Sequence, residues 1–314
     1  MPVHRIRGQG GSAVRGHRRG GQPRDLRPAA AGEVVKVCLI RGSGVEQHEV
    51  DSVFRAMRAR QVDAVELKRD AKAEMVAELL KETDLILTLG GDGTFLAGAR
   101  VAAPRDIAVL GVNHGHLGFL TEIEAEEMDV GLGRFFDGSY RIEERTMLEV
   151  TQSRKGRTLI QEIGLNEVVV DHSGETNILR LEIDVGGQRV GVIDADGAIV
   201  ATASGSTAYA LASGGPILEP TLEDLVLVPM SPFALTVRPI VFAPGQEISL
   251  TVVRGPGEMR VDGQGRGQVV AIGDVVSCRS HAKRLKVIRF SPPESFYQRL
   301  ADKLGWGRPL VPKK

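Results

Sequence analysis

The feature that most constrains this chain is a glycine-rich loop, Gly90-Gly91-Asp92-Gly93-Thr94, directly after an apolar run over residues 84–89. Residues 95–101 suit a helix, so we expect the loop to join the end of a buried strand to a helix. Glycines permit positive φ and let a phosphate approach the backbone closely. Successive N–H groups and the helix N-terminus both attract anions. The pattern predicts a phosphate-binding loop made by Gly90, Gly91, Gly93 and Thr94, with Asp92 beside the bound phosphates.

The loop has a simpler alternative, in which it is a tight turn with Asp92 as a helix N-cap. Two glycines before the acid and Gly93-Thr94 after it, at the end of a strand, favour the functional interpretation. It is not the usual dinucleotide fingerprint, because Leu96 stands at the third glycine position. The chain has no Gly-Lys pair, which excludes a Walker A loop, and neither His-Arg-Asp nor Asp-Phe-Gly, which excludes the protein-kinase set.

The hydrophobic pattern predicts two kinds of domain. Strands are expected over 34–40, 62–67, 84–89 and 107–112, and helices over 45–60, 71–81 and 95–101. This alternation predicts an α/β domain with a parallel sheet over residues 33–145. After about Arg145, short and often alternating segments (168–170, 179–185, 188–193, 198–201, 248–253, 259–261 and 275–278) predict a mainly antiparallel β domain over residues 146–293. A helix over 294–305 is expected to pack back on the first domain.

Composition narrows the class of protein. The 314 residues carry 40 basic and 40 acidic side chains, so no net field attracts nucleic acid or an anionic membrane. No apolar run reaches the roughly 18 residues that span a bilayer. Cys38 and Cys278 do not resemble a disulfide framework, which fits a reducing cytoplasm, and neither has neighbours at zinc-site spacing. We therefore assign no metal site to protein residues and no nucleic-acid or membrane partner.

Residues 1–32 differ from the rest, with arginines among glycines and a single acid, Asp25. Such a segment buries too little apolar surface to offset the entropy of ordering it. We expect a disordered basic tail; a nucleic-acid-binding tail is the alternative.

Three later segments carry chemistry of their own. Asn166-Glu167 offers an amide and a carboxylate to ribose hydroxyls, or is an ordinary polar pair at a strand start. Ser204 to Tyr209 gathers hydroxyls among small residues, which suits a polar ligand close to the backbone, or is a plain Ser/Gly loop. Asp196 is a turn residue or a carboxylate facing an amide. His114 and His116 are candidate metal ligands, but histidines in such positions are more often solvated or hydrogen-bonded in the core.

The loop resembles the signature of a superfamily that contains NAD kinases, diacylglycerol-type lipid kinases and, more distantly, phosphofructokinases. The segment from Gly111 to Thr121, the Asn166-Glu167 pair, and the stretch from Asp196 through Ser204-Gly205-Ser206-Thr207-Ala208-Tyr209 to Gly214-Gly215-Pro216 all resemble the NAD kinase family. The resemblance runs from about Val34 onward. It implies a phosphofructokinase- and diacylglycerol-kinase-like α/β domain followed by the antiparallel β domain.

The resemblance also implies the reaction and the site. A phosphoryl group would pass from ATP, or inorganic polyphosphate, to the 2′-hydroxyl of the adenosine ribose of NAD, giving NADP, with Mg²⁺ or another divalent cation carried on the donor. Asp92 would be catalytic, and a homodimer or homotetramer in the cytoplasm is expected. The implied NAD site comprises Asp92, Gly93, Phe95, Asn166, Glu167, Asn177, Asp194, Asp196, Ser204, Thr207, Ala208, Tyr209, Ala210, Leu211, Ala212 and Gln264, with Asp262 as a neighbouring contact.

Three rivals share part of this pattern. A lipid kinase would need an exposed apolar or basic membrane face, which the neutral charge does not favour. A sugar kinase of the phosphofructokinase type would need basic residues for a sugar phosphate that we cannot place. A module that senses NAD without catalysis would bind NAD and form no product, and the intact Asp92 argues against it.

Overall fold

The computed structural model describes residues 5–6, 35–67, 73–115, 118–172, 178–263, 265 and 267–305. The chain divides into two compact units, one made of Met1–Glu143 with Lys286–Lys314 and the other of Glu144–Leu285. The second unit is therefore inserted into the chain of the first. Each unit is described by itself.

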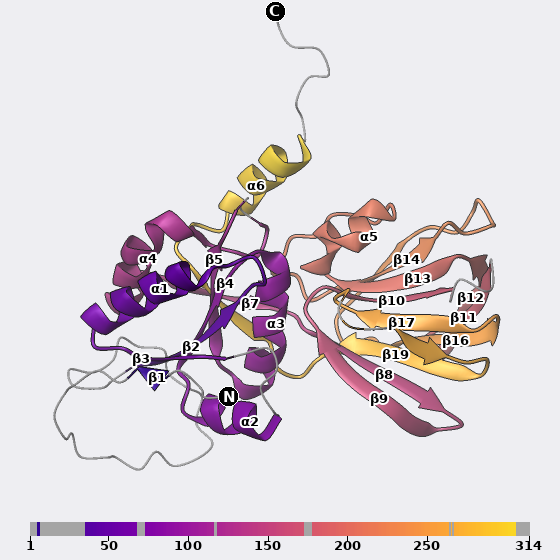
Figure 1. The fold of residues 1–314 in the computed structure, drawn as a ribbon. Helices are drawn as coiled ribbons and strands as arrows, with labels where there is room; N and C mark the ends of the chain where they lie inside the picture. Colours follow the sequence, from indigo (N-terminus) through magenta and orange to yellow (C-terminus); the bar gives the residue numbers. More distant parts are fainter. Residues whose placement is uncertain are drawn as a thin grey trace, which may run out of the picture. The chain divides into compact units, whose positions relative to one another are not determined.

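The first unit is built on an eight-stranded sheet with the order β1-β3-β2-β4-β5-β20-β7, in which β6 pairs with β5 (Figure 1). The strands are β1 (Arg5–Ile6), β2 (Lys36–Arg41), β3 (Asp63–Glu66), β4 (Leu85–Leu89), β5 (Ala108–Asn113), β6 (Ile123–Glu124), β7 (Arg141–Arg145) and β20 (Leu285–Arg289). β2 pairs in parallel with β3 and β4, and β5 pairs in parallel with β4, β6 and β20. The predicted parallel sheet is confirmed.

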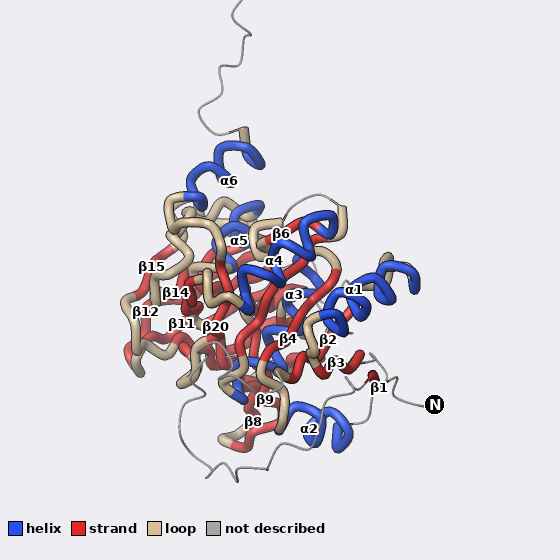
Figure 2. Tube along the Cα trace, turned by 90° about the vertical axis from the view of Figure 1, so that its left-hand side faces the viewer, coloured by secondary structure: helices blue, strands red, loops and turns tan. Residues whose placement is uncertain are grey.

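The first unit also contains helices. They are α1 (Gln47–Ala59), α2 (Ala73–Lys81), α3 (Asp92–Ala102), α4 (Met128–Phe136) and α6 (Ser295–Leu304), with 3₁₀ turns at Ala103–Arg105 and Ala125–Glu127. Val50, Val53, Phe54 and Met57, the apolar positions at helical spacing in α1, are its buried residues. They pack with Leu132 and Phe135 of α4 and with β2, β4 and β5, so α1 and α4 lie together over one face (Figure 2).

The second unit is a sandwich of two six-stranded antiparallel sheets, with the orders β15-β14-β13-β10-β17-β18 and β12-β11-β16-β19-β8-β9. Its strands are β8 (Leu148–Arg154), β9 (Arg157–Gly164), β10 (Glu167–His172), β11 (Leu179–Val185), β12 (Gln188–Ala195), β13 (Gly197–Thr202), β14 (Leu225–Met230), β15 (Ile240–Phe242), β16 (Ile248–Arg254), β17 (Gly257–Val261), β18 (Gln268–Val270) and β19 (Asp274–Ser280). The main core lies between the sheets, where alternate residues of both face inward.

A second, smaller core lies on the outer face of the sheet that contains β10. Val169, Ile199 and Val226 pack there against Ala210 of the short helix α5 (Tyr209–Ala212). The 3₁₀ turn Gly205–Thr207 precedes α5 and follows β13 closely. The Ser/Gly segment singled out from the sequence therefore caps this face of the sheet (Figure 1).

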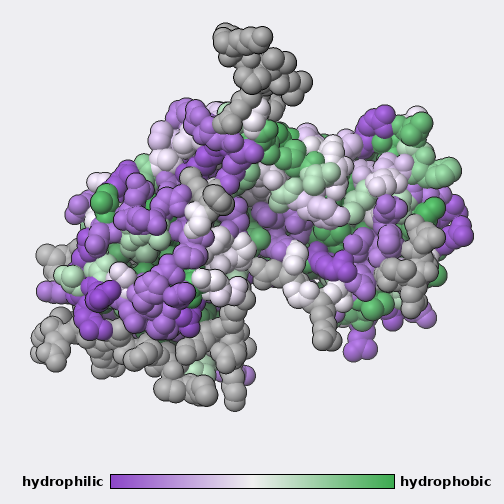
Figure 3. Space-filling model, turned by 45° about the horizontal axis from the view of Figure 1, so that its top comes forward, coloured by the Kyte–Doolittle hydropathy of each residue, from purple (hydrophilic) through white to green (hydrophobic). Residues whose placement is uncertain are grey.

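Large apolar side chains are exposed on the second unit, and hydrophobic patches appear in green in Figure 3. Phe233 and Leu235, between β14 and β15, are 81% and 84% exposed. No helix in the described part of the chain has the length and apolar character needed to cross a membrane.

The structure differs from the sequence predictions in three respects. Arg5–Ile6 forms β1 and pairs antiparallel with β3, although we expected disorder there; most of the expected tail lies outside the described residues. Residues 286–293, expected in the second domain, belong to the first unit because β20 pairs with β5. The helix expected from Phe95 begins three residues earlier, so Asp92, Gly93 and Thr94 form the first turn of α3.

Candidate active site

The glycine loop follows the fully buried strand β4 and enters α3 directly. Gly90 has φ +149°, a conformation that favours glycine, and its N–H donates to the Val112 carbonyl at 2.9 Å. A side chain at Gly90 would collide with Thr94, whereas a Cβ at Gly91 or Gly93 would meet nothing within 4 Å. The first glycine thus forms the turn, and the next two leave open space beside the start of α3.

The Asp92 carboxylate is held by a second backbone turn. The N–H groups of Phe119 and Leu120 donate to its Oδ2 and Oδ1 at 3.0 and 3.1 Å. A Cβ at Gly118 would overlap this carboxylate, so the turn approaches Asp92 only because residue 118 is glycine. The predicted catalytic residue and the Gly111–Thr121 segment are therefore brought together.

Phe95 follows the loop in α3, and its N–H donates to the Gly91 carbonyl at 3.2 Å. Its side chain is fully buried, and a Cβ at Gly111 would lie 2.8 Å from its ring. The ring packs against Gly111 of β5 in the core, and the NAD contact expected of Phe95 stays a prediction. Nδ1 of His114 lies 2.9 Å from a carboxylate oxygen of Glu49 in α1, and His116 lies outside the described residues.

In the second unit, Asn166 and Glu167 form a buried corner at the start of β10. They are 8% and 5% exposed. Asp262 fixes the corner: its Oδ2 accepts the N–H of Leu165 at 2.9 Å, and its Oδ1 accepts those of Asn166 and Glu167 at 2.8 and 3.3 Å. The expected contact residue Asp262 therefore orients the pair through the backbone, and its own side chain is 6% exposed.

Two oxygens of this corner have no hydrogen-bond partner among the described residues. They are Oδ1 of Asn166 and Oε2 of Glu167, both buried. A buried acceptor without a donor is costly, and native proteins leave few of them. A ligand with hydrogen-bond donors would satisfy both oxygens.

Glu167 has an unusual acidity. Burial, together with the nearby negative charge of Asp262, raises the pKa of Glu167 to about 8, and an N–H of Tyr209 offsets part of this. The low-dielectric surroundings disfavour the charged carboxylate. The raised pKa favours the protonated carboxyl, which can donate a hydrogen bond as well as accept one.

The hydroxyl groups of the Ser/Gly segment make hydrogen bonds within the second unit. The Ser204 hydroxyl accepts a hydrogen bond from Arg145 at 3.0 Å, and Thr207 donates to the Ser204 carbonyl at 3.2 Å. Ala210 is fully buried in the smaller core. Tyr209 is 46% exposed. Ala208, Leu211 and Ala212 are partly or fully exposed around it.

The remaining predicted residues lie apart from the corner or outside the description. Asp194, on β12, makes two 2.8 Å hydrogen bonds with Arg180 of β11, and these lower the pKa of its carboxyl. Asp196, between β12 and β13, is partly exposed. Asn177 and Gln264 lie outside the described residues.

Comparisons with known proteins agree with these motifs. A model of the ATP-NAD kinase N-terminal domain matches residues 31–140, and one of the ATP-NAD kinase C-terminal domain matches residues 165–290. An NAD kinase of Heliobacterium modesticaldum is 44% identical over 231 residues, 73% of this chain and 81% of that protein. The chain belongs to the NAD kinase family. An NAD kinase of Gemmatimonas aurantiaca is 39% identical over 241 residues, 75% of this chain and 82% of that protein.

Solved NAD kinase-family structures share this fold. The crystal structure of yeast NADH kinase complexed with NADH superposes with a TM-score of 0.81 and 21% identity, covering 90% of each chain. An NAD kinase from Archaeoglobus fulgidus in complex with ATP gives a TM-score of 0.70 and 24% identity, covering 87% of this chain and 100% of that one. The family's fold class, predicted from the sequence, is confirmed.

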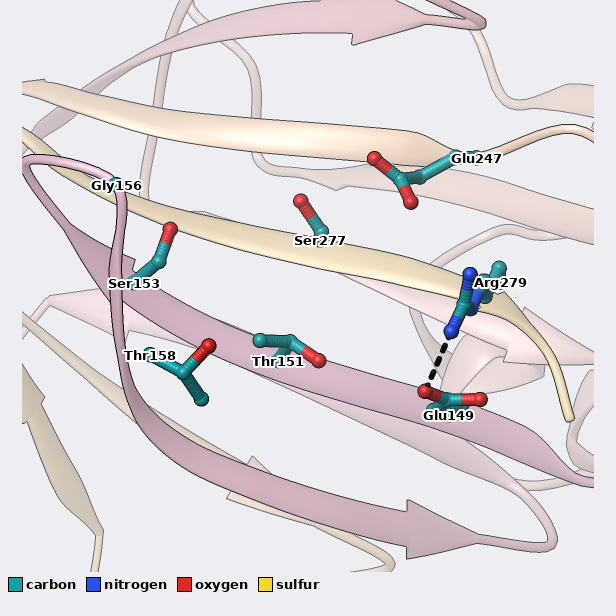
Figure 4. Close-up of a pocket in the computed structure, with 8 residues that line it drawn as sticks. All are labelled: Glu149, Thr151, Ser153, Gly156, Thr158, Glu247, Ser277 and Arg279. Carbon is teal, nitrogen blue, oxygen red and sulfur yellow. Dashed lines mark hydrogen bonds and ion pairs between the residues drawn. The ribbon is translucent and has the colours of Figure 1, made fainter.

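A separate pocket lies on the outer face of the sheet that contains β8 and β19 (Figure 4). Its lining is polar, with Thr151, Ser277 and the ion pair between Glu149 and Arg279 at 2.8 Å. None of the residues predicted for the active site lines it, so it does not belong to the site described above.

Proposed function

We propose that this chain transfers a phosphoryl group from ATP to the 2′-hydroxyl of the adenosine ribose of NAD, giving NADP. One observation of the structure carries the proposal: the buried corner of Asn166 and Glu167 holds two unpartnered oxygens. Ribose hydroxyls donate and accept hydrogen bonds, so a ribose diol satisfies both. Membership of the NAD kinase family supports NAD as the molecule that carries this ribose.

Asp92 is the proposed catalytic group. The 2′-oxygen attacks the γ-phosphorus of ATP, the bond to the β,γ-bridging oxygen breaks, ADP leaves, and the hydroxyl proton passes to the Asp92 carboxylate. Such transfer depends mainly on positioning and charge stabilisation. Two backbone N–H groups fix the direction of this carboxylate, and it stays partly exposed in the first turn of α3.

We propose that the donor arrives as a complex with Mg²⁺ and that the backbone around Gly91 and Gly93 receives its phosphates. The open space beside these glycines supports this role. Among the described residues, no group of three or more His, Cys, Asp and Glu side chains is arranged to hold a metal ion. The cation would neutralise charge on the donor phosphates. Inorganic polyphosphate offers the same phosphate chemistry and remains a second donor to test.

We also propose a cytoplasmic homo-oligomer, a homodimer or homotetramer. The exposed side chains of Phe233 and Leu235 support association, because isolated soluble chains seldom leave such apolar groups clustered in water. Cys38 and Cys278 are free and buried, which fits a reducing compartment. Sedimentation of the purified protein would test the assembly.

The decisive experiment measures NADP formation by the purified protein with NAD and Mg²⁺, with ATP and polyphosphate supplied separately. Product that disappears with Asp92→Asn would establish the kinase and identify its donor. NAD binding without product from either donor would instead support a module that senses NAD.

A further inference from the structure

The turn that holds Asp92 is itself anchored by residues far along the chain. Arg289, on β20, donates to the carbonyl of Leu120 at 2.9 Å. Arg299, on α6, donates to the carbonyl of Thr121 at 3.1 Å. The N–H groups of Phe119 and Leu120 bond to Asp92, so the two guanidinium groups hold the peptide units that directly follow those bound to the carboxylate.

Glu122 joins the two arginines. Its Oε2 accepts from Arg289 at 3.0 Å and from Arg299 at 2.9 Å, and its Oε1 accepts the N–H groups of Phe290 and Ser291 at 2.8 and 2.7 Å. The side chains of Glu122, Arg289 and Arg299 are 1%, 3% and 15% exposed. Arg289 also pairs with Glu143 at 3.1 Å. Ion pairs that are buried and fully hydrogen-bonded have a defined geometry, unlike exposed ones.

The acidity of Glu122 agrees with a persistent network. Burial alone would raise its pKa, but the charge of Arg289 and hydrogen bonds from Ser291 and Arg299 outweigh it, and the pKa is lowered. The network therefore stays charged at neutral pH. α6 makes a second contact with the same turn, because the Lys303 ammonium lies over the Phe119 ring, 5.6 Å from its centroid.

We propose that Arg289 and Arg299, linked by Glu122, are positioning residues that set the orientation of the Asp92 carboxylate through the Phe119–Thr121 turn. The inference rests on the proposed catalytic role of Asp92. A carboxylate that accepts a proton in the transition state must point one lone pair at the hydroxyl, and a misplacement of about 1 Å costs roughly a hundredfold in rate. The arginines contact neither substrate and act only through the Phe119–Thr121 turn.

Arg299→Gln is the sharpest variant, because Arg299 is the most exposed member of the network and its loss leaves Arg289 paired with Glu122. Gln298→Ala is the matched control: it lies next to Arg299 on α6, and its side chain bonds Asp302 on the exposed surface. We expect Arg299→Gln to lower kcat at least about tenfold with KM for NAD changed less than about twofold. Gln298→Ala should leave both parameters unchanged.

Two further readouts separate positioning from plain destabilisation. Hydrogen exchange at the amides of Phe119 and Leu120 should accelerate in Arg299→Gln and not in Gln298→Ala. In combination with Asp92→Asn, Arg299→Gln should lower kcat no further, because the carboxylate it orients is gone. Arg299→Lys keeps the positive charge but loses the planar guanidinium group that bonds two partners at once. Its kcat and its amide exchange rates should therefore lie between those of wild type and Arg299→Gln.

A folded Arg299→Gln protein with wild-type kcat and wild-type exchange would overturn the inference, as would fully additive losses with Asp92→Asn. If Arg299→Gln does not fold, Arg299→Lys decides by the same measurements. A wild-type protein that makes no NADP would overturn the proposed function instead, while the exchange of Phe119 and Leu120 would still test the anchoring of the turn.

Discussion

Glu167 and Asp262 are tied to each other in both directions through the backbone: the Glu167 N–H donates to the Asp262 carboxylate at 3.3 Å, and the Asp262 N–H donates to the Glu167 carbonyl at 2.9 Å. Two acidic side chains are thereby fixed at one buried corner. Burial and the negative charge of Asp262 together raise the pKa of Glu167.

This arrangement makes stability depend on pH. The unfolded Glu167 titrates near 4.5 and the folded one near 8, so between these values the folded state binds more protons. The stabilising contribution is fully present below the lower value and is lost as the pH rises through the upper one, by at most about 1.4 kcal/mol per pH unit. Glu167→Gln cannot titrate. Its free energy of unfolding relative to wild type should therefore rise between about pH 5 and about pH 9. Urea unfolding across this range checks it, and a constant difference would contradict the raised pKa.

Asp262→Asn should weaken the corner itself. Three N–H groups now share the two carboxylate oxygens of Asp262, and an asparagine would offer them only one acceptor oxygen. We therefore expect a loss of about 1–3 kcal/mol in the free energy of unfolding, and weaker NAD binding. Asp184→Asn, on β11, is the matched control in the same unit. Calorimetric titration with NAD gives the binding constant; equal affinity in both variants would show that Asp262 does not position Asn166 and Glu167.

Asp92→Asn should lower kcat by at least about a hundredfold, the scale of a lost proton acceptor, while NAD affinity stays near that of wild type. Steady-state kinetics and calorimetry separate the two effects. Unchanged turnover would remove Asp92 from the mechanism.

Gly118→Ala should abolish most of the activity, although it leaves Asp92 and every other side chain with a proposed chemical role unchanged. The added Cβ would overlap the Asp92 carboxylate and force the turn or the side chain to move. Gly133→Ala provides the control: it lies in α4 with open space around the new methyl, so it should be neutral or stabilise by about 0.5–1 kcal/mol. An active Gly118→Ala protein would mean that the contact between the turn and Asp92 is dispensable.

Local sequence patterns predicted the parts of the fold that depend on local chemistry. The spacing of Val50, Phe54 and Met57 defined the buried face of α1, and the loop after β4 marked the passage from strand to helix. β20 could not be predicted in the same way, because it joins the first sheet through parallel pairing with β5, which lies far away in sequence. Pattern alone does not reveal which distant strand pairs with which.

The sequence predicted candidate site residues, but it did not predict how the fold holds them. Asn166 and Glu167 do form a buried corner, but the motif gave no sign that Phe95 and Ala210 are core residues. The sequence also did not predict that Asp262 accepts three backbone N–H groups, because such bonds do not depend on the side chains of the residues that donate them. Glu122 and Arg289, missed altogether, are visible only once the strands are paired.

The insertion of the second unit into the chain of the first bears on how the protein is made. A ribosome finishes residues 144–285 before it reaches the strand and helix that anchor the Asp92 turn. Until Arg289 and Arg299 emerge, the nascent first unit lacks both guanidinium groups that hold Leu120 and Thr121. A product that ends before residue 286 would therefore carry the glycine loop and Asp92 but neither of the two arginines that fix the turn beside that carboxylate.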